Sequence, residues 1–250
     1  MLPCDLGDPK GGRADLVAKT EAAFGPIDIL VNNAVAHALK PVDEWSIEEL
    51  EEYAHVNLWA PWLHMSQVLP GMRERGRGWI LNLTSFSGEL PPGPPFAFKA
   101  KDGSSMYGAT KAALNRLTVA AAGENEGQGI AVNALTPQCA IATPRVQAGG
   151  LVAGAELFEP VETMAEAALA LCTGDPSVLT GRIAFSLQLL LELDRPVYDL
   201  RGKELMDGWQ PDDLVEVIRA QEAFHEGNSW PRAFDFHRVH TPRPAVLDAP

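Results

Sequence analysis

Tyr107 and Lys111 stand four residues apart in the stretch Tyr107-Gly108-Ala109-Thr110-Lys111. Four residues are just over one turn of an α-helix, so on a helix the two side chains share a face. An ammonium group beside a phenol favours the phenolate and lowers the phenol's pKa from about 10. A phenol tuned in this way can pass a proton to or from a substrate oxygen. The spacing therefore predicts an acid/base pair.

A hydroxyl precedes this pair, at the end of an apolar run. The run Gly78-Trp79-Ile80-Leu81-Asn82-Leu83 is typical of a buried strand, and Ser85 follows it closely. We expect Ser85 to hold the substrate oxygen beside Tyr107. Thr84 and Ser87 are alternative hydroxyls at the same strand end, and a role in a turn or cap is the alternative for Ser85.

With these residues, the chain resembles the short-chain dehydrogenase/reductase family over about residues 5 to 187. The motifs that carry the resemblance stand in the family's order and are Asn32-Asn33-Ala34, Asn57, Ser85, Tyr107 with Lys111, and Asn133-Ala134-Leu135-Thr136-Pro137. The resemblance implies an oxidoreductase that transfers a hydride between NAD or NADP and a secondary alcohol or ketone. It also implies a homodimer or homotetramer.

The resemblance assigns a role to each of four catalytic residues. Tyr107 is expected to be the acid/base, and Lys111 to lower the pKa of Tyr107 and bind the nicotinamide ribose. Ser85 is expected to position the substrate oxygen. Asn57 is expected to hold, through its main-chain carbonyl, a water that links Lys111 to solvent, although a satisfied core amide is the alternative. Pro61, four residues after Asn57, cannot donate a hydrogen bond to that carbonyl, so we expect the carbonyl to be unpaired at a kink.

The resemblance also places residues around the cofactor. Asp5 matches the family's acidic residue at the adenine ring, and Ile141-Ala142-Thr143 resembles the segment that meets the nicotinamide carboxamide. Val35 stands where the family has a glycine beside the cofactor's ribose. The expected cofactor-binding residues are Asp5, Leu6, Asn33, Ala34, Tyr107, Lys111, Pro137, Ile141 and Thr143.

The resemblance also implies an α/β fold. The expected architecture is a Rossmann-like, doubly wound parallel sheet in three α/β/α layers. Residues 1–6 look like the end of a strand, residues 27–31 like a buried parallel strand, and residues 183–187 like the last strand. Helices are expected over residues 13–24, from Ser46 with a capping box to Glu49, and over 104–123 and 162–171. We expect this domain to span residues 1–190.

The expected fold lacks one part. No glycine-rich phosphate loop opens a βα unit, and Gly11-Gly12 is interpreted as a flexible turn before a helix. We therefore expect the first βαβ portion of the fold to be missing from this chain. Residues 191–250 are expected to form an extension with one helix, from Pro211 to near Gly227, and a tail.

Composition narrows the possible partners. A net charge of −13 argues against a nucleic-acid or anionic-membrane surface, and no apolar run approaches the roughly 20 residues that span a bilayer. Three widely spaced cysteines suggest a reducing, cytoplasmic setting without disulfides or a metal cluster.

The expected partner is a small-molecule substrate. The Pro- and Phe-rich insert over 89–103 suggests an apolar one, with a simple surface excursion as the alternative, and residues 145–160 resemble the family's substrate loop.

Two hypotheses of different class follow. The four catalytic matches favour an enzyme. The missing phosphate loop and Val35 favour a truncated, non-catalytic paralogue that acts as a binding or subunit partner.

Overall fold

Residues 2–9, 12–91, 93–96, 101–144, 146, 158–227 and 243–248 are described by the structure, which is a computed structural model. The chain folds into two units. Unit 1 comprises Met1–Leu90, Phe98–Ala134 and Leu171–Arg182, and unit 2 comprises Pro91–Ala97, Leu135–Ala170 and Ile183–Pro250. Much of the predicted insert and substrate loop (92, 97–100, 145 and 147–157) and residues 228–242 of the tail lie outside the described residues.

Unit 1 contains a sheet in the order β1-β2-β3. β1 (Ile29–Asn32) pairs in parallel with β2 (Gly78–Leu83), with Ile29 opposite Trp79 and Asn32 opposite Asn82. β3 (Ile130–Thr136) is buried along its whole length. Because β1 and β2 are parallel, the residues that follow them, Asn33 and Ser85, leave the same edge of the sheet.

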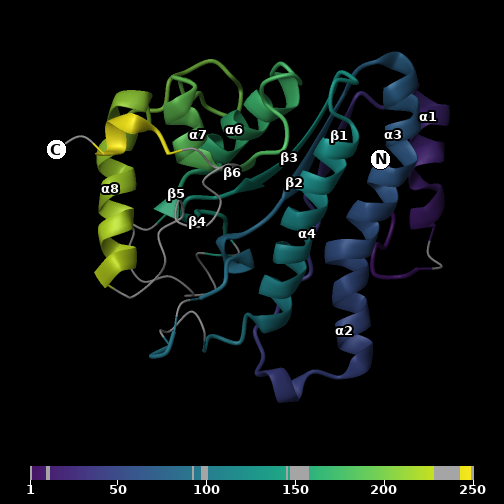
Figure 1. The fold of residues 1–250 in the computed structure, drawn as a ribbon, viewed down its shortest axis with the longest axis horizontal. Coiled ribbons are helices and arrows are strands. Elements are labelled where there is room, and N and C mark those ends of the chain that lie inside the picture. The colour runs from purple at the N-terminus through teal and green to yellow at the C-terminus, as the bar shows by residue number, and fades with distance from the viewer. Residues whose placement is uncertain are drawn as a thin grey trace. The chain divides into compact units, whose positions relative to one another are not determined.

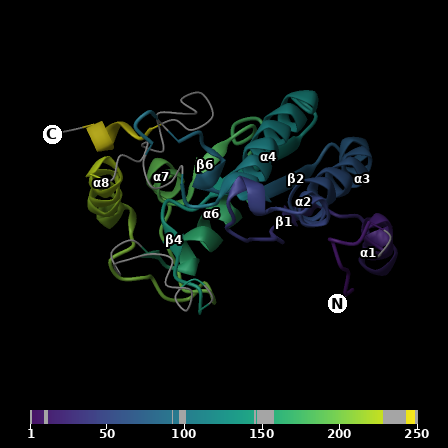
Figure 2. The same ribbon diagram turned by 90° about the horizontal axis from the view of Figure 1, so that it is seen from below.

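Helices and short helical turns lie before and between these strands along the chain. They are η1 (Arg13–Asp15), α1 (Leu16–Phe24), η2 (Val42–Glu44), α2 (Ile47–Ala54), η3 (His55–Trp59, a π-helix), α3 (Ala60–Arg75), η4 (Phe86–Gly88) and α4 (Ser105–Glu124). α2, η3 and α3 follow one another as one rod, and α4 runs alongside it (Figures 1 and 2). One apolar core joins α1, α3 and α4 to the sheet, with side chains that include Val17, Met65, Val68, Met72, Ile80, Ala121, Ile130 and Val132.

The described part of unit 2 contains a short ribbon, a further strand and several helices. β4 (Ala140–Ile141) pairs in parallel with β5 (Phe158–Glu159). α6 (Val161–Thr173), β6 (Ile183–Phe185), α7 (Ser186–Glu192), α8 (Pro211–Gly227) and η8 (Ala245–Asp248) follow. α7 packs against α8. Arg243, just before η8, forms a two-pronged ion pair with Glu222 of α8, which ties the two elements together.

The α/β class and the parallel pairing are confirmed, and most predicted helices are found within one or two residues of their expected bounds. The capping box is confirmed as well, because Glu49 N donates to Ser46 Oγ (3.2 Å) and Ser46 N donates to Glu49 Oε2 (3.0 Å). The predicted boundary between a domain over residues 1–190 and an extension over 191–250 stays a prediction. Across the described residues, no helix is both long and apolar enough to cross a membrane.

Three strand predictions need correction. Residues 2–6 are not a strand: Pro3 cannot donate to a ladder, and Asp5 Oδ1 instead accepts a bond from Gly7 N (2.8 Å), a local turn. β1 is parallel but not buried, since Ile29 and Val31 are 44% and 48% exposed. The last strand ends at Phe185, because Ser186 already begins α7, whose Leu and Gln residues are good helix formers.

Candidate active site

Ser85 leaves β2 in an extended conformation and begins the short turn η4. Its Oγ accepts a hydrogen bond from Ser87 N (3.2 Å). The turn lies directly on α4 because two glycines leave room. A Cβ on Gly108 would lie 2.4 Å from Ser87 O, and one on Gly88 would lie 3.0 Å from Ala112 N. This close approach brings the Ser85 hydroxyl to the first turn of α4.

Tyr107 lies in that first turn and is half-buried. Its phenol lies within the influence of the Ser85 hydroxyl, which favours the phenolate. Burial raises the pKa of Tyr107, and the Ser85 hydroxyl lowers it by less, so the net direction is upward. The predicted lowering of this pKa is therefore wrong for the chain alone. The reason is that burial disfavours the charged phenolate, which outweighs its neighbours.

Lys111, one turn further along α4, is buried, with 3% of its surface exposed. Its Nζ donates to Leu83 O (2.7 Å) at the end of β2 and lies 5.7 Å from the centroid of the Tyr107 ring. Burial lowers the pKa of the Lys111 ammonium to about 8. The predicted proximity of the two side chains is confirmed.

Asn57 lies in the π-helix η3, where Ala60 N donates to His55 O. Such single π-turns are frequent at functional sites. The Asn57 amide pairs in both directions with Ala36, accepting from its N (2.8 Å) and donating to its O (3.0 Å). Asn57 Nδ2 also donates to Thr110 Oγ1 (3.2 Å). The amide is thus satisfied in the core, and a role for the Asn57 carbonyl in holding water stays a prediction.

Unit 1 therefore brings Asn57, Ser85, Tyr107 and Lys111 together around the start of α4. Asn33 and Ala34 are exposed just beyond β1. Asp5 is exposed too, and Leu6 O accepts a bond from Arg13 Nη1 (2.8 Å). The remaining predicted cofactor residues belong to unit 2, so their part in the site stays a prediction; they are Pro137, Ile141 in β4, and Thr143.

Sequence reasoning missed three contributors to this site. Gly108 and Thr110 lie inside the Tyr107–Lys111 motif. The absence of a side chain at Gly108 was the signal that could have indicated a close approach of another segment. Thr110 Oγ1 donates to Tyr107 O (2.9 Å). His37 packs its ring edge-on against Tyr107, with ring centroids 4.8 Å apart. No local pattern marks His37, because the contact depends on the path of the loop after β1.

A protein-family model described as short chain dehydrogenase matches residues 1–149. The chain belongs to this family. A fatty acyl-CoA reductase of Mycobacterium tuberculosis is 32% identical over 197 residues, which cover 76% of this chain and 61% of that protein. An uncharacterized oxidoreductase of Bacillus subtilis is 36% identical over 124 residues, 50% of this chain and 45% of that protein. The chain spans about half the length of several relatives that it matches.

Solved structures of other proteins resemble the chain as well. A gluconate 5-dehydrogenase from Burkholderia cenocepacia, in complex with NADP and tartrate, superposes with a TM-score of 0.58 at 27% identity over 72% of this chain and 71% of that one. A blue fluorescent protein from a metagenomic library, in complex with NADPH, superposes with a TM-score of 0.61 at 27% identity over 71% of this chain and 70% of that one.

Proposed function

We propose that this chain acts in an NAD(P)-dependent oxidoreductase that transfers a hydride between the nicotinamide cofactor and a secondary alcohol or ketone. The observation that carries the proposal is the Ser85 hydroxyl acting on the Tyr107 phenol, with the Lys111 ammonium 5.7 Å from the phenol ring. This arrangement provides a proton donor, a hydroxyl that can orient the oxygen receiving the proton, and a cation that stabilises the phenolate left behind.

The donor groups of unit 1 fit the nicotinamide half of the cofactor. The Lys111 ammonium carries three N–H donors, and among the described residues it bonds only to Leu83 O, so it can also bind ribose hydroxyls. Asn33 and Ala34 are exposed where β1 ends, the edge at which parallel α/β sheets bind ligands. When bound, the cofactor supplies or accepts the hydride. Two relatives support this reading, the NADP-bound gluconate 5-dehydrogenase and an acetoacetyl-CoA reductase of Rhizobium meliloti that is 36% identical over 123 residues.

The protein's own residues would then divide the work. In the reducing direction, Tyr107 Oη gives its proton to the substrate oxygen, which Ser85 Oγ holds by a hydrogen bond. The buried ammonium of Lys111 stabilises the resulting phenolate, and its effect is strengthened by the low local dielectric. Asn57 fixes both the loop at Ala36 and the helix at Thr110, so it keeps this geometry in place.

The proposal also covers the cellular location and the oligomeric state of the protein. We place the protein in the cytoplasm as a homodimer or homotetramer. The thiols of Cys139 and Cys172 are unbridged, as in a reducing compartment. Trp59 and Trp62, on the rod that contains Asn57, are about half exposed with ring centroids 6.4 Å apart, and paired exposed aromatics are enriched at interfaces.

The test compares two neighbouring hydroxyls. The wild-type chain, Ser85→Ala and Ser87→Ala are assayed with NADH or NADPH and acetoacetyl-CoA, and with NAD or NADP and gluconate, by the nicotinamide absorbance. We expect Ser85→Ala to lower kcat by about 10²-fold, as for a lost transition-state hydrogen-bond donor, and Ser87→Ala to change it little. Equal turnover by Ser85→Ala and the wild type, or no nicotinamide binding in calorimetry, would contradict the proposal.

A further inference from the structure

His37 is an unassigned side chain within ring contact of the proposed acid/base. Its imidazole meets the Tyr107 phenol edge-on, with centroids 4.8 Å apart and an angle of 74° between the ring planes. This is the geometry that aromatic pairs prefer, because the positive edge of one ring faces the negative face of the other. The His37 side chain is itself half-buried, so its ring is packed against the protein.

The backbone around His37 is fixed at both ends to the segment that carries Tyr107. On one side, Ala36 is held in both directions by the Asn57 amide, which also bonds to Thr110 of α4. On the other side, Lys40 N donates to Gly103 O (3.0 Å), two residues before α4 begins. The approach at Gly103 is so close that a Cβ there would lie 2.8 Å from Lys40 N, and its φ of 76° favours glycine.

These restraints mean that the imidazole and the phenol cannot drift apart independently. The loop through Ala36 and Lys40 is clamped to the start of α4, and His37 projects from the middle of that clamped loop. A residue held this tightly against a reactive side chain is suited to fix that side chain's orientation, which proximity effects make valuable in catalysis.

We propose that His37 is a positioning residue for Tyr107: its imidazole covers one side of the phenol, fixes the orientation of the ring and keeps water from that side. The significance of His37 for catalysis rests on the proposed function, whereas its effect on the phenol does not. The groups that face the phenol are then Ser85 from the end of β2, Lys111 from α4 and His37 from the loop after β1.

The direct test is a spectroscopic titration of Tyr107. The chain has three tyrosines, so the tyrosinate absorbance of Tyr107 is obtained by subtracting the curve of a Tyr107→Phe variant. Burial raises the pKa of Tyr107. Removing the imidazole with His37→Ala admits water to the phenol, so we expect the pKa of Tyr107 to fall toward the ordinary tyrosine value.

Two further variants separate ring packing from other effects. His37→Phe keeps an aromatic ring at the contact, so we expect it to restore the wild-type pKa of Tyr107. Lys40→Met, on the same loop, removes an ion pair to Glu49 but leaves the imidazole in place, so we expect no change. In the hydride-transfer assay, His37→Ala should lower kcat by about three- to tenfold with KM little altered, and His37→Phe should recover it.

Each outcome decides the proposal. An unchanged Tyr107 pKa in His37→Ala, or a pKa that His37→Phe does not restore, would overturn it. If His37→Ala fails to fold by circular dichroism, His37→Asn, a polar side chain that is larger than alanine but carries no ring to cover the phenol, takes its place with the same expectation. If the titrations come out as expected but the wild-type chain transfers no hydride to any ketone, the proposed function fails while the positioning role stands.

Discussion

Unit 1 and unit 2 each bury one ionisable side chain whose pKa moves toward neutrality for the same reason. Burial lowers the pKa of Lys111 to about 8 and raises that of Glu159 to about 7. Their partners differ. Glu159 accepts bonds from Thr163 Oγ1 (2.7 Å), Ser186 Oγ (2.7 Å) and Cys139 N (3.1 Å). Lys111 donates to the Leu83 carbonyl and, among the described residues, to no other group.

The difference indicates that Glu159 has a structural role, whereas Lys111 can still bind a ligand. The donors around Glu159 come from the segment before β4, from α6 and from the start of α7, so its carboxyl group joins three parts of unit 2. The Lys111 ammonium, in contrast, keeps two N–H groups available beside a phenol. A buried charge with unused donors is costly, and such a cost is typical of functional sites.

The largest expected effect comes from Lys111→Met. Without the ammonium beside Tyr107, we expect kcat for hydride transfer to fall by about 10²-fold or more. The free energy of unfolding at neutral pH should rise by about 1–3 kcal/mol, because the folded state no longer has to bury a charge that the unfolded state exposes. Steady-state kinetics and denaturant unfolding measure the two effects.

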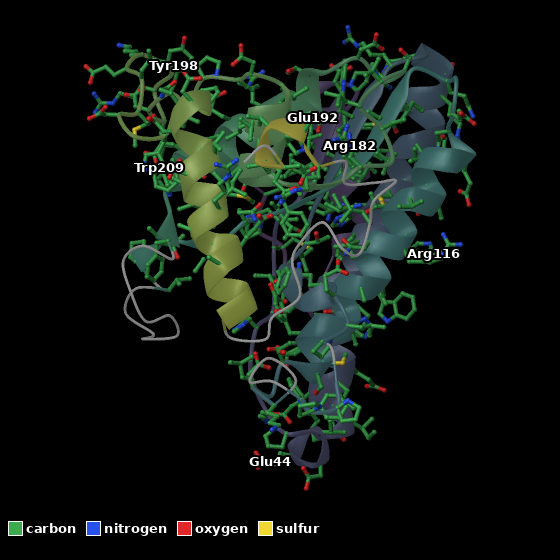
Figure 3. The ribbon with its side chains drawn as sticks, turned by 60° about the vertical axis from the view of Figure 1, so that its left-hand side comes forward. Glu44, Arg116, Arg182, Glu192, Tyr198 and Trp209 are labelled. Atoms are coloured by element: carbon green, nitrogen blue, oxygen red, sulfur yellow. The ribbon has the colours of Figure 1, made fainter. Side chains whose placement is uncertain are left out.

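Arg116→Met is the matched control for this variant. Arg116 is an exposed base on the same helix and projects outward from α4 (Figure 3). We expect both its turnover and its stability to stay close to wild type, since surface substitutions are usually within about 0.5 kcal/mol. If Lys111→Met kept the turnover of the wild type, the buried Lys111 ammonium would have no more functional role than the buried Glu159 carboxyl.

A smaller effect is expected from Glu159→Gln, and it depends on pH. The folded pKa of Glu159, about 7, lies above the ordinary value of 4.5, so the folded state binds the proton more tightly than the unfolded state. The stability from this group is therefore full below about pH 4.5 and is lost as the pH rises to about 7, by up to about 3 kcal/mol.

Glu159→Gln should flatten that dependence while leaving turnover within about threefold of wild type. The measurement is the free energy of unfolding of both proteins, followed by denaturant titration at a series of pH values. A wild-type stability that rose across this window, or a parallel curve for the glutamine variant, would show that the Glu159 carboxyl is not held in its protonated form.

Much of this molecule could be predicted from local patterns. The strand before Ser85, the capping box at Ser46 and the helix bearing Tyr107 and Lys111 all follow from residue types close together in the chain. The four predicted catalytic residues gather in unit 1 for the same reason, since their motifs mark strand ends and one helix face.

What could not be predicted depends on the surroundings in space. The exposure of Ile29 and Val31 is set by which strands pair with β1, and the turn at Asp5 by a single side-chain bond. The direction of the Tyr107 pKa is set by burial, which the Tyr-Lys spacing does not reveal. His37 was missed because the contact between its ring and Tyr107 joins residues 70 positions apart.

The most direct test of the account is the turnover of Tyr107→Phe beside that of Tyr53→Phe. Tyr53 is a buried tyrosine of α2 whose ring packs against Trp45 (centroids 4.9 Å apart), so its variant controls for the loss of a buried hydroxyl. With the wild-type chain active on a ketone and NADH or NADPH, we predict that Tyr107→Phe loses at least about 10²-fold in kcat while Tyr53→Phe stays within about threefold. Near-normal turnover by Tyr107→Phe would contradict the assignment of Tyr107 as the proton donor.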